Sequence, residues 1–104
     1  MKIPDKVKIG GVDYTIAYEK KLILSSNKAG LGCIDYDNAV IKIEPDVQCE
    51  QAKCLTLLHE IMHGIAEHFG LNINDNEDVI DKLAKGLYMV IKDNPEMFGG
   101  VPNG

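Results

Sequence analysis

Apolar and polar positions alternate in the first part of the chain. Residues 6–9 alternate in this way, and residues 12–16 do so again after two glycines. A period of two is typical of half-buried β-strands, and a glycine pair between two such runs is a strong hairpin signal. The pattern returns in residues 33–36 and 39–43, on either side of a short polar turn. The sequence therefore predicts two β-hairpins.

The pattern changes to a helical period after Pro45. Asp46 is a candidate N-cap for a helix that carries Glu50 in its first turn and runs to about Phe69, where Gly70 follows as a stop signal. Apolar residues lie on most sides of this helix, which indicates a buried central helix. They are Leu55, Leu57, Leu58, Ile61, Met62, Ile65, Ala66 and Phe69.

A second helix is predicted in the last third of the chain. Residues 74–77 open it, apolar residues recur at helical spacing, and Asn94-Pro95 ends it. Two hairpins followed by two helices give an α+β fold with a small antiparallel sheet, in one domain over residues 1–94. Residues 95–104 are rich in glycine and proline and are predicted to form a flexible tail.

Composition and charge exclude several kinds of partner. The net charge of -5 is spread along the 104 residues, and no dense cluster of Lys and Arg predicts nucleic-acid binding. No apolar stretch predicts a secretory signal or a membrane span, so we expect a cytoplasmic protein. Cys33, Cys49 and Cys54 form no C-x-x-C pair, and we expect them to be reduced and buried.

Residues 59–63 read H-E-I-M-H, an H-E-x-x-H motif inside the predicted central helix. Residues four apart are separated by about 40° around a helix, so both imidazoles project from one face and can share a tetrahedral ion. Such a motif on a helix is typical of a zinc site. We therefore expect His59 and His63 to bind Zn²⁺.

Glu60 is offset by about 100° from His59, so it is not expected to join the ligands. Its carboxylate can instead reach a zinc-activated water, accept its proton near neutral pH and later pass that proton to the leaving amine. Glu60 is therefore the predicted general base of peptide-bond hydrolysis.

A catalytic zinc site normally uses three protein ligands and keeps one position open, so a third ligand is expected on the second helix. Residues 76–81 read N-E-D-V-I-D and resemble the N-E-x-x-x-D element of gluzincin metallopeptidases, the thermolysin-like class. The resemblance implies that Glu77 is the third ligand. It also implies that Asp81, one turn further on, accepts a hydrogen bond from a ligand histidine, most simply His59.

Other interpretations of this segment stay open. Asn74 and Glu77 have the spacing of a capping box, in which Glu77 would bond only to the helix backbone. Asp78 or Asp81 would then be the third ligand. His68 is nine positions after the first histidine of the motif, about 180° around the helix, and is expected to face solvent.

The gluzincin resemblance also concerns the substrate. It implies that an edge strand near the active-site helix binds the substrate backbone, and residues 39–43 are the candidate. The alternative is that this strand is paired on both sides. Tyr88 is expected near the face of Glu77 and Asp81, where it polarises the substrate carbonyl or serves as a buried structural residue.

The whole chain also resembles small metallopeptidases related to the ImmA/IrrE family, which phages and mobile elements often encode. The resemblance extends from the first hairpin to Asn94 and is clearest in residues 57–63, with a weaker match in residues 83–88. The E-x-x-A-N-x-F-A segment of that family is represented only loosely. A metzincin site is excluded because Ala66 and Phe69 stand where that class has Gly and His.

These observations predict a minimal, zincin-like zinc endopeptidase that acts on a protein or peptide substrate. Two other classes remain as alternatives. One is a zinc-binding regulatory or interaction protein without turnover, in which a fourth protein ligand would close the site. The other is a small phage structural protein in which the motif arises by chance and binds no zinc.

Overall fold

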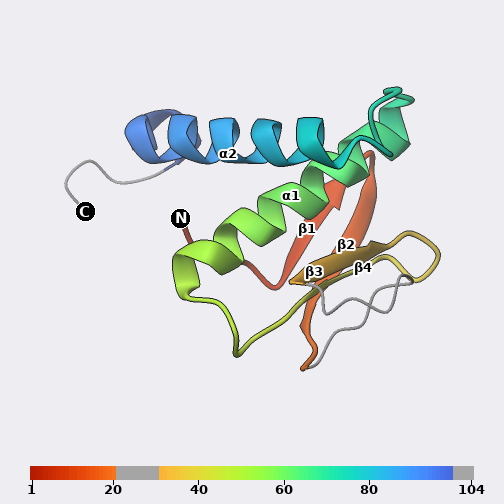
Figure 1. Cartoon of the computed structure of the whole chain (residues 1–104), viewed down its shortest axis with the longest axis horizontal. Coiled ribbons are helices and arrows are strands. Elements are labelled where there is room, and N and C mark those ends of the chain that lie inside the picture. The colour runs from red at the N-terminus through yellow and green to blue at the C-terminus, as the bar shows by residue number, and fades with distance from the viewer. Residues whose placement is uncertain (21–30, 100–104) are drawn as a thin grey trace.

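The computed structural model describes residues 1–20 and 31–99, and it has a four-stranded sheet followed by two long helices (Figure 1). The strands are β1 (Lys6–Ile9), β2 (Val12–Tyr18), β3 (Gly32–Asp35) and β4 (Val40–Ile43). The helices are α1 (Glu50–Phe69), α2 (Glu77–Asp93) and the short 3-10 helix η1 (Pro95–Phe98). This element order confirms the predicted α+β fold class.

Both predicted hairpins form, and each is antiparallel. The turn of the first hairpin uses Gly10 and Gly11, whose φ angles of 57° and 82° favour glycine. The strand order is β1-β2-β4-β3, and the central pair β2 and β4 is parallel. The sheet is therefore mixed, which corrects the expectation of antiparallel pairing at this one position. After β2, the next strand along the chain is β3, which lies at the edge of the sheet. β4 then lies between β2 and β3.

This topology overturns the choice of residues 39–43 as the substrate-binding edge strand. β4 pairs with β2 on one side and with β3 on the other. Its inward side chains Ile41 and Ile43 are fully buried, as a central strand requires. Among the described strands, β3 forms the edge of the sheet at this end.

α1 is the middle of three layers. One of its sides packs against the sheet, and α2 covers another side (Figure 1). This burial on two sides confirms the prediction of a central helix and explains why apolar residues surround it. The main cluster of buried side chains between the sheet and α1 consists of Ile9, Tyr14, Ile16, Ile41, Ile43 and Leu57.

The start of α1 differs from the prediction. The helix begins at Glu50 and not after Asp46, because the backbone N–H groups of Asp46 and Val47 donate to the Glu44 carboxylate at 2.9 and 2.6 Å. These bonds fold residues 44–47 into a turn. The helix ends at Phe69 as predicted, and Gly70 adopts the left-handed conformation with φ 67°.

The predicted C-terminal tail begins with structure, since η1 occupies its first four residues. Residues 100–104, the end of this tail, lie outside the described part of the chain, as do residues 21–30 between β2 and β3. Neither long helix within residues 1–20 and 31–99 combines the length and the apolar character needed to cross a membrane.

His68 is exposed, as the sequence suggested, but it also makes a structural contact. Its Nε2 atom lies 2.6 Å from the hydroxyl of Tyr14, a side chain that is only 1% exposed. Its ring also covers Gly10 so closely that a Cβ atom there would lie 2.7 Å from the imidazole. His68 therefore fastens the end of α1 to the first hairpin, a long-range contact that helix geometry alone did not reveal.

Gly32 sets how closely β3 approaches α1, so Gly32→Ala should destabilise the fold. A Cβ atom at this position would lie 2.5 Å from Thr56 Cγ2 and 3.0 Å from the backbone oxygen of Lys42, which has little freedom to move. Overpacking of this kind costs about 1–3 kcal/mol, and thermal denaturation should show a lower melting temperature. Gly86→Ala is the control, because Gly86 is exposed in α2 and an added Cβ atom would have no neighbour from outside the helix backbone within 4 Å. Alanine there should stabilise the fold by up to about 1 kcal/mol. Equal or higher stability of Gly32→Ala would contradict the packing argument.

Candidate metal centre

The two histidines of the motif lie on one face of α1, one turn apart. Their ring centroids are 5.0 Å apart, and their side chains are 21% and 12% exposed for His59 and His63. The helix itself fixes this spacing, because residues at i and i+4 project in nearly the same direction. Both rings line a cleft of about 960 Å³ between β3, α1 and α2.

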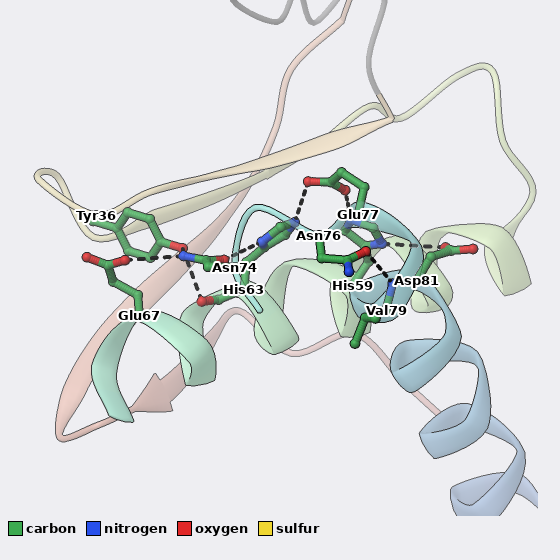
Figure 2. Close-up of polar contacts among 9 residues, drawn as sticks. All are labelled: Tyr36, His59, His63, Glu67, Asn74, Asn76, Glu77, Val79 and Asp81. Atoms are coloured by element: carbon green, nitrogen blue, oxygen red, sulfur yellow. Dashed lines mark hydrogen bonds and ion pairs between the residues drawn. The ribbon is translucent and has the colours of Figure 1, made fainter. Parts of the chain in front are cut away.

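α2 delivers Glu77 to the two histidines. The carboxylate oxygen Oε2 lies 2.9 Å from His59 Nε2, and Oε1 lies 3.0 Å from His63 Nε2 (Figure 2). One ligand atom from each of the three residues lies within 4.8 Å of the others. The structure thus brings His59, His63 and Glu77 together in the arrangement that the sequence predicted for three metal ligands.

The capping-box alternative for Glu77 is wrong in this structure. Asn76 is the N-cap of α2, and its side chain accepts a hydrogen bond from the backbone N–H of Val79 at 3.2 Å. Asn76 provides the cap of the helix, and the side chain of Glu77 contacts the two histidines instead of the helix backbone. Asp78 pairs with Lys82 at 2.9 Å on the exposed side of α2, so it is not positioned as the third ligand.

The outer nitrogen of each imidazole faces an oxygen acceptor. His63 Nδ1 lies 2.5 Å from Asn74 Oδ1, and His59 Nδ1 lies 3.5 Å from Asp81 Oδ1 (Figure 2). The amide orientation of Asn74 is fixed by Glu67, since the Asn74 Nδ2 group donates to that carboxylate at 3.2 Å. These contacts favour the tautomer in which Nδ1 carries the hydrogen, and Nε2 of each ring faces Glu77.

This arrangement favours a positive charge in the centre. A neutral imidazole donates through one nitrogen only, and Asn74 and Asp81 already accept from the Nδ1 atoms. Each Nε2 atom then presents a lone pair to the Glu77 carboxylate, which also only accepts. Acceptors that face each other at 2.9–3.0 Å repel unless a proton or a metal ion lies between them. The geometry is therefore suited to bind a cation.

Glu60 lies beside this cluster and lines the same cleft. Its side chain is nearly buried, at 7% exposure for the residue. Burial raises the pKa of the Glu60 carboxyl, while the neighbouring His59 and His63 act in the opposite direction. A carboxyl of this kind is available to accept a proton from a molecule in the cleft.

The edge strand β3 forms the wall of the cleft opposite α2. The backbone N–H of Glu44 donates to the oxygen of Leu31, which makes these two residues a hydrogen-bonded pair across β3 and β4. In an antiparallel ladder such pairs alternate, so the N–H and C=O groups of Gly32 and Ile34 point away from β4. The cleft is therefore bordered by backbone donors and acceptors that the described strands leave available.

The prediction missed two polar residues of the site, Tyr36 and Asn74. The hydroxyl of Tyr36 donates to the backbone oxygen of His63 at 3.1 Å, and burial raises the pKa of this phenol. Asn74 was considered only as a helix-capping residue. Tyr88, which was expected near Glu77, is not among the described residues that line the cleft. Spacing along the chain carries no signal for these contacts, because they join separate elements.

No known protein family model matches this chain, and comparisons with curated proteins and with solved structures also find no match. The interpretation of the site therefore depends on its own geometry and chemistry.

The buried carboxylate of Glu60 should lower the stability of the metal-free protein at high pH. The folded-state pKa is raised above the unfolded value, so folding stability falls as pH rises from the ordinary pKa of Glu through the folded pKa. Glu60→Gln removes the ionisation, and after chelation it should melt at a higher temperature than wild type at pH 8, with a smaller difference at pH 5.

Glu96→Gln is the matched control for this comparison, because Glu96 is exposed in η1 and should show no such dependence. Thermal denaturation by circular dichroism measures all three proteins. A wild type that is as stable as Glu60→Gln at pH 8 would show that the charge of Glu60 is not penalised by burial.

Proposed function

We propose that this chain is a zinc-dependent metallopeptidase, with His59, His63 and Glu77 as zinc ligands and Glu60 as general base. The observation that carries the proposal is the convergence of three ligand atoms within 4.8 Å on the wall of a cleft that Glu60 also lines. Two imidazoles and one carboxylate are a common ligand set of catalytic zinc, whereas Mg²⁺ and Ca²⁺ prefer oxygen ligands.

The reaction follows from the position of Glu60. Zinc at this site supplies Lewis acidity, which polarises a carbonyl and lowers the pKa of water. Glu60 accepts a proton from the water whose oxygen bonds to the carbonyl carbon of the substrate. It then donates that proton to the amide nitrogen as the C–N bond breaks, which leaves a carboxylic acid and an amine. The raised pKa of Glu60 suits a group that both accepts and donates the proton.

The openness of the site favours turnover over a structural role. A structural zinc ion is normally enclosed by four protein ligands. Within the described part of the chain, the metal-binding group contains only His59, His63 and Glu77. The Glu77 side chain is 69% exposed, so this side of the site is open to solvent and substrate. This observation supports a peptidase more than a closed zinc-binding module.

The adjacent edge strand supports a peptide as the substrate. An extended peptide can add to a sheet edge through backbone hydrogen bonds, and β3 offers those of Gly32 and Ile34 beside Glu60. β3 therefore takes the role that the sequence assigned to residues 39–43. We place the activity in the cytoplasm, since Cys33, Cys49 and Cys54 are all unbridged.

Metal content tests the ligands. Wild-type protein purified without chelator should contain about one zinc per chain by elemental analysis, and His63→Ala and Glu77→Gln should each lose most of it. Asp78→Asn is the matched control for Glu77→Gln, because Asp78 is the next residue in α2 but faces Lys82. Zinc that is absent from wild type, or retained in both ligand variants, would contradict the site.

Turnover tests the general base. Glu60→Gln should keep its zinc but cleave an unstructured peptide library at least about 100-fold more slowly than wild type, because removal of a general base typically costs at least this factor. Cleavage can be followed by mass spectrometry, with zinc content measured on the same samples. A wild type that binds zinc and cleaves nothing would instead identify a metal-binding protein without turnover.

A further inference from the structure

The two ends of the cleft differ in chemistry. The end beside the first half of α1 is formed by the apolar side chains of Leu31, Ala52 and Leu55. The opposite end, beyond His63, is formed by the polar residues Tyr36, Asn74 and Asp75. A peptide that lies along the cleft therefore meets an apolar surface on one side of the metal centre and a polar, acidic one on the other.

The direction of β3 determines whether the N-terminal or the C-terminal half of a bound peptide lies at the apolar end of the cleft. β3 runs in the same direction as α1, because Gly32 lies against Thr56, and Ile34 lies against Gly64 about two turns further along the helix. A peptide that pairs with β3 in the more stable antiparallel mode runs the opposite way. Its C-terminal half then lies at the apolar end, so the residue after the cleaved bond contacts Leu31 and Leu55.

Lys85 adds a positive charge to the apolar end. It lies on α2 one turn beyond Asp81, and it is the one cation among the described residues that line the cleft. Its ammonium is 2.8 Å from Asp81, but the two side chains are 63% and 45% exposed, so the pair is weak. An ammonium has three N–H donors, and Asp81 accepts from one of them. Lys85 therefore retains donors for a second carboxylate.

We propose that the cleft selects peptides in which an apolar residue follows the cleaved bond and a carboxylate comes shortly after it, bound by Lys85. The carboxylate belongs to an acidic side chain or to the C-terminus of the peptide, which share the same chemistry. This proposal rests on the proposed function, since the metal centre defines the cleaved bond. Asp75 at the opposite end of the cleft repels a carboxylate, and Lys85 is the one Lys or Arg among the described lining residues.

Binding to an inactive variant tests this selectivity without turnover. Fluorescent peptides that differ only in Glu, Gln or Lys after the apolar residue are titrated into zinc-loaded Glu60→Gln, and one further pair compares a free with an amidated C-terminus. The Glu peptide should bind about three- to fivefold more tightly than the Gln peptide, as expected for one exposed ion pair. A preference for the free C-terminus over the amide would identify the terminus as the carboxylate source.

Reversing the charge of Lys85 provides the decisive comparison. Glu60→Gln with Lys85→Glu should prefer the Lys peptide, whereas Glu60→Gln with Lys82→Glu should keep the original order. Lys82 is the matched control because it lies on α2, carries the same charge and does not line the cleft. Zinc content and melting temperature are measured for each variant, so that loss of metal or of the fold is recognised.

The outcomes separate this inference from the proposed function. Equal binding of all the peptides, or an equal effect of the two charge reversals, overturns the selectivity by Lys85. Wild-type protein that cleaves peptides without regard to their charge overturns this inference and leaves the peptidase standing. A third outcome is that binding depends on charge but wild type cleaves none of the bound peptides. That outcome supports the selectivity and contradicts the peptidase.

Discussion

The burial of α1 between the sheet and α2 is the constraint on which the rest of the structure depends. A helix that is covered on two sides must be apolar around most of its circumference, and this helix also carries two histidines and a glutamate at its centre. Polar groups in such a position are costly unless they find partners. Asn74, Asp81 and Glu77 supply partners for the histidines, and all three come from the segment that follows α1. The packing of α2 on α1 is therefore inseparable from the formation of the site.

Glu60 differs from the two histidines in this respect. It is nearly as buried as the core residues around it, yet it carries a carboxyl group whose pKa is raised by that burial. Folding alone would favour an apolar residue or a neutral partner at this position. Local destabilisation of this kind is typical of functional groups, because a group that is already satisfied by the protein is less able to act on a substrate.

How far the sequence predicted the site depends on where each contact lies along the chain. His59, Glu60 and His63 belong to one helix, so the helical period alone placed them on their faces. The candidate third ligand, Glu77, was found only through a resemblance, because periodicity does not reveal how α2 packs on α1. Asn74 and Tyr36 were missed for the same reason, since their contacts with His63 join a loop, a strand end and a helix. His68 is exposed as predicted, but its contact with Tyr14 was missed because the two residues are 54 positions apart.

The strand order was the other part that sequence patterns did not determine, and it has a direct effect on the cleft. Alternating residues predict a strand and a glycine pair predicts a hairpin, but neither specifies which strands become neighbours. The parallel pairing of β2 with β4 displaces β3 to the edge of the described sheet. With antiparallel pairing of consecutive strands, β4 would have formed that edge, and its buried isoleucines would have faced a different environment. Gly32 has no side chain, which allows the displaced strand to lie against Thr56. The strand order and this glycine together bring a backbone edge to the candidate metal centre.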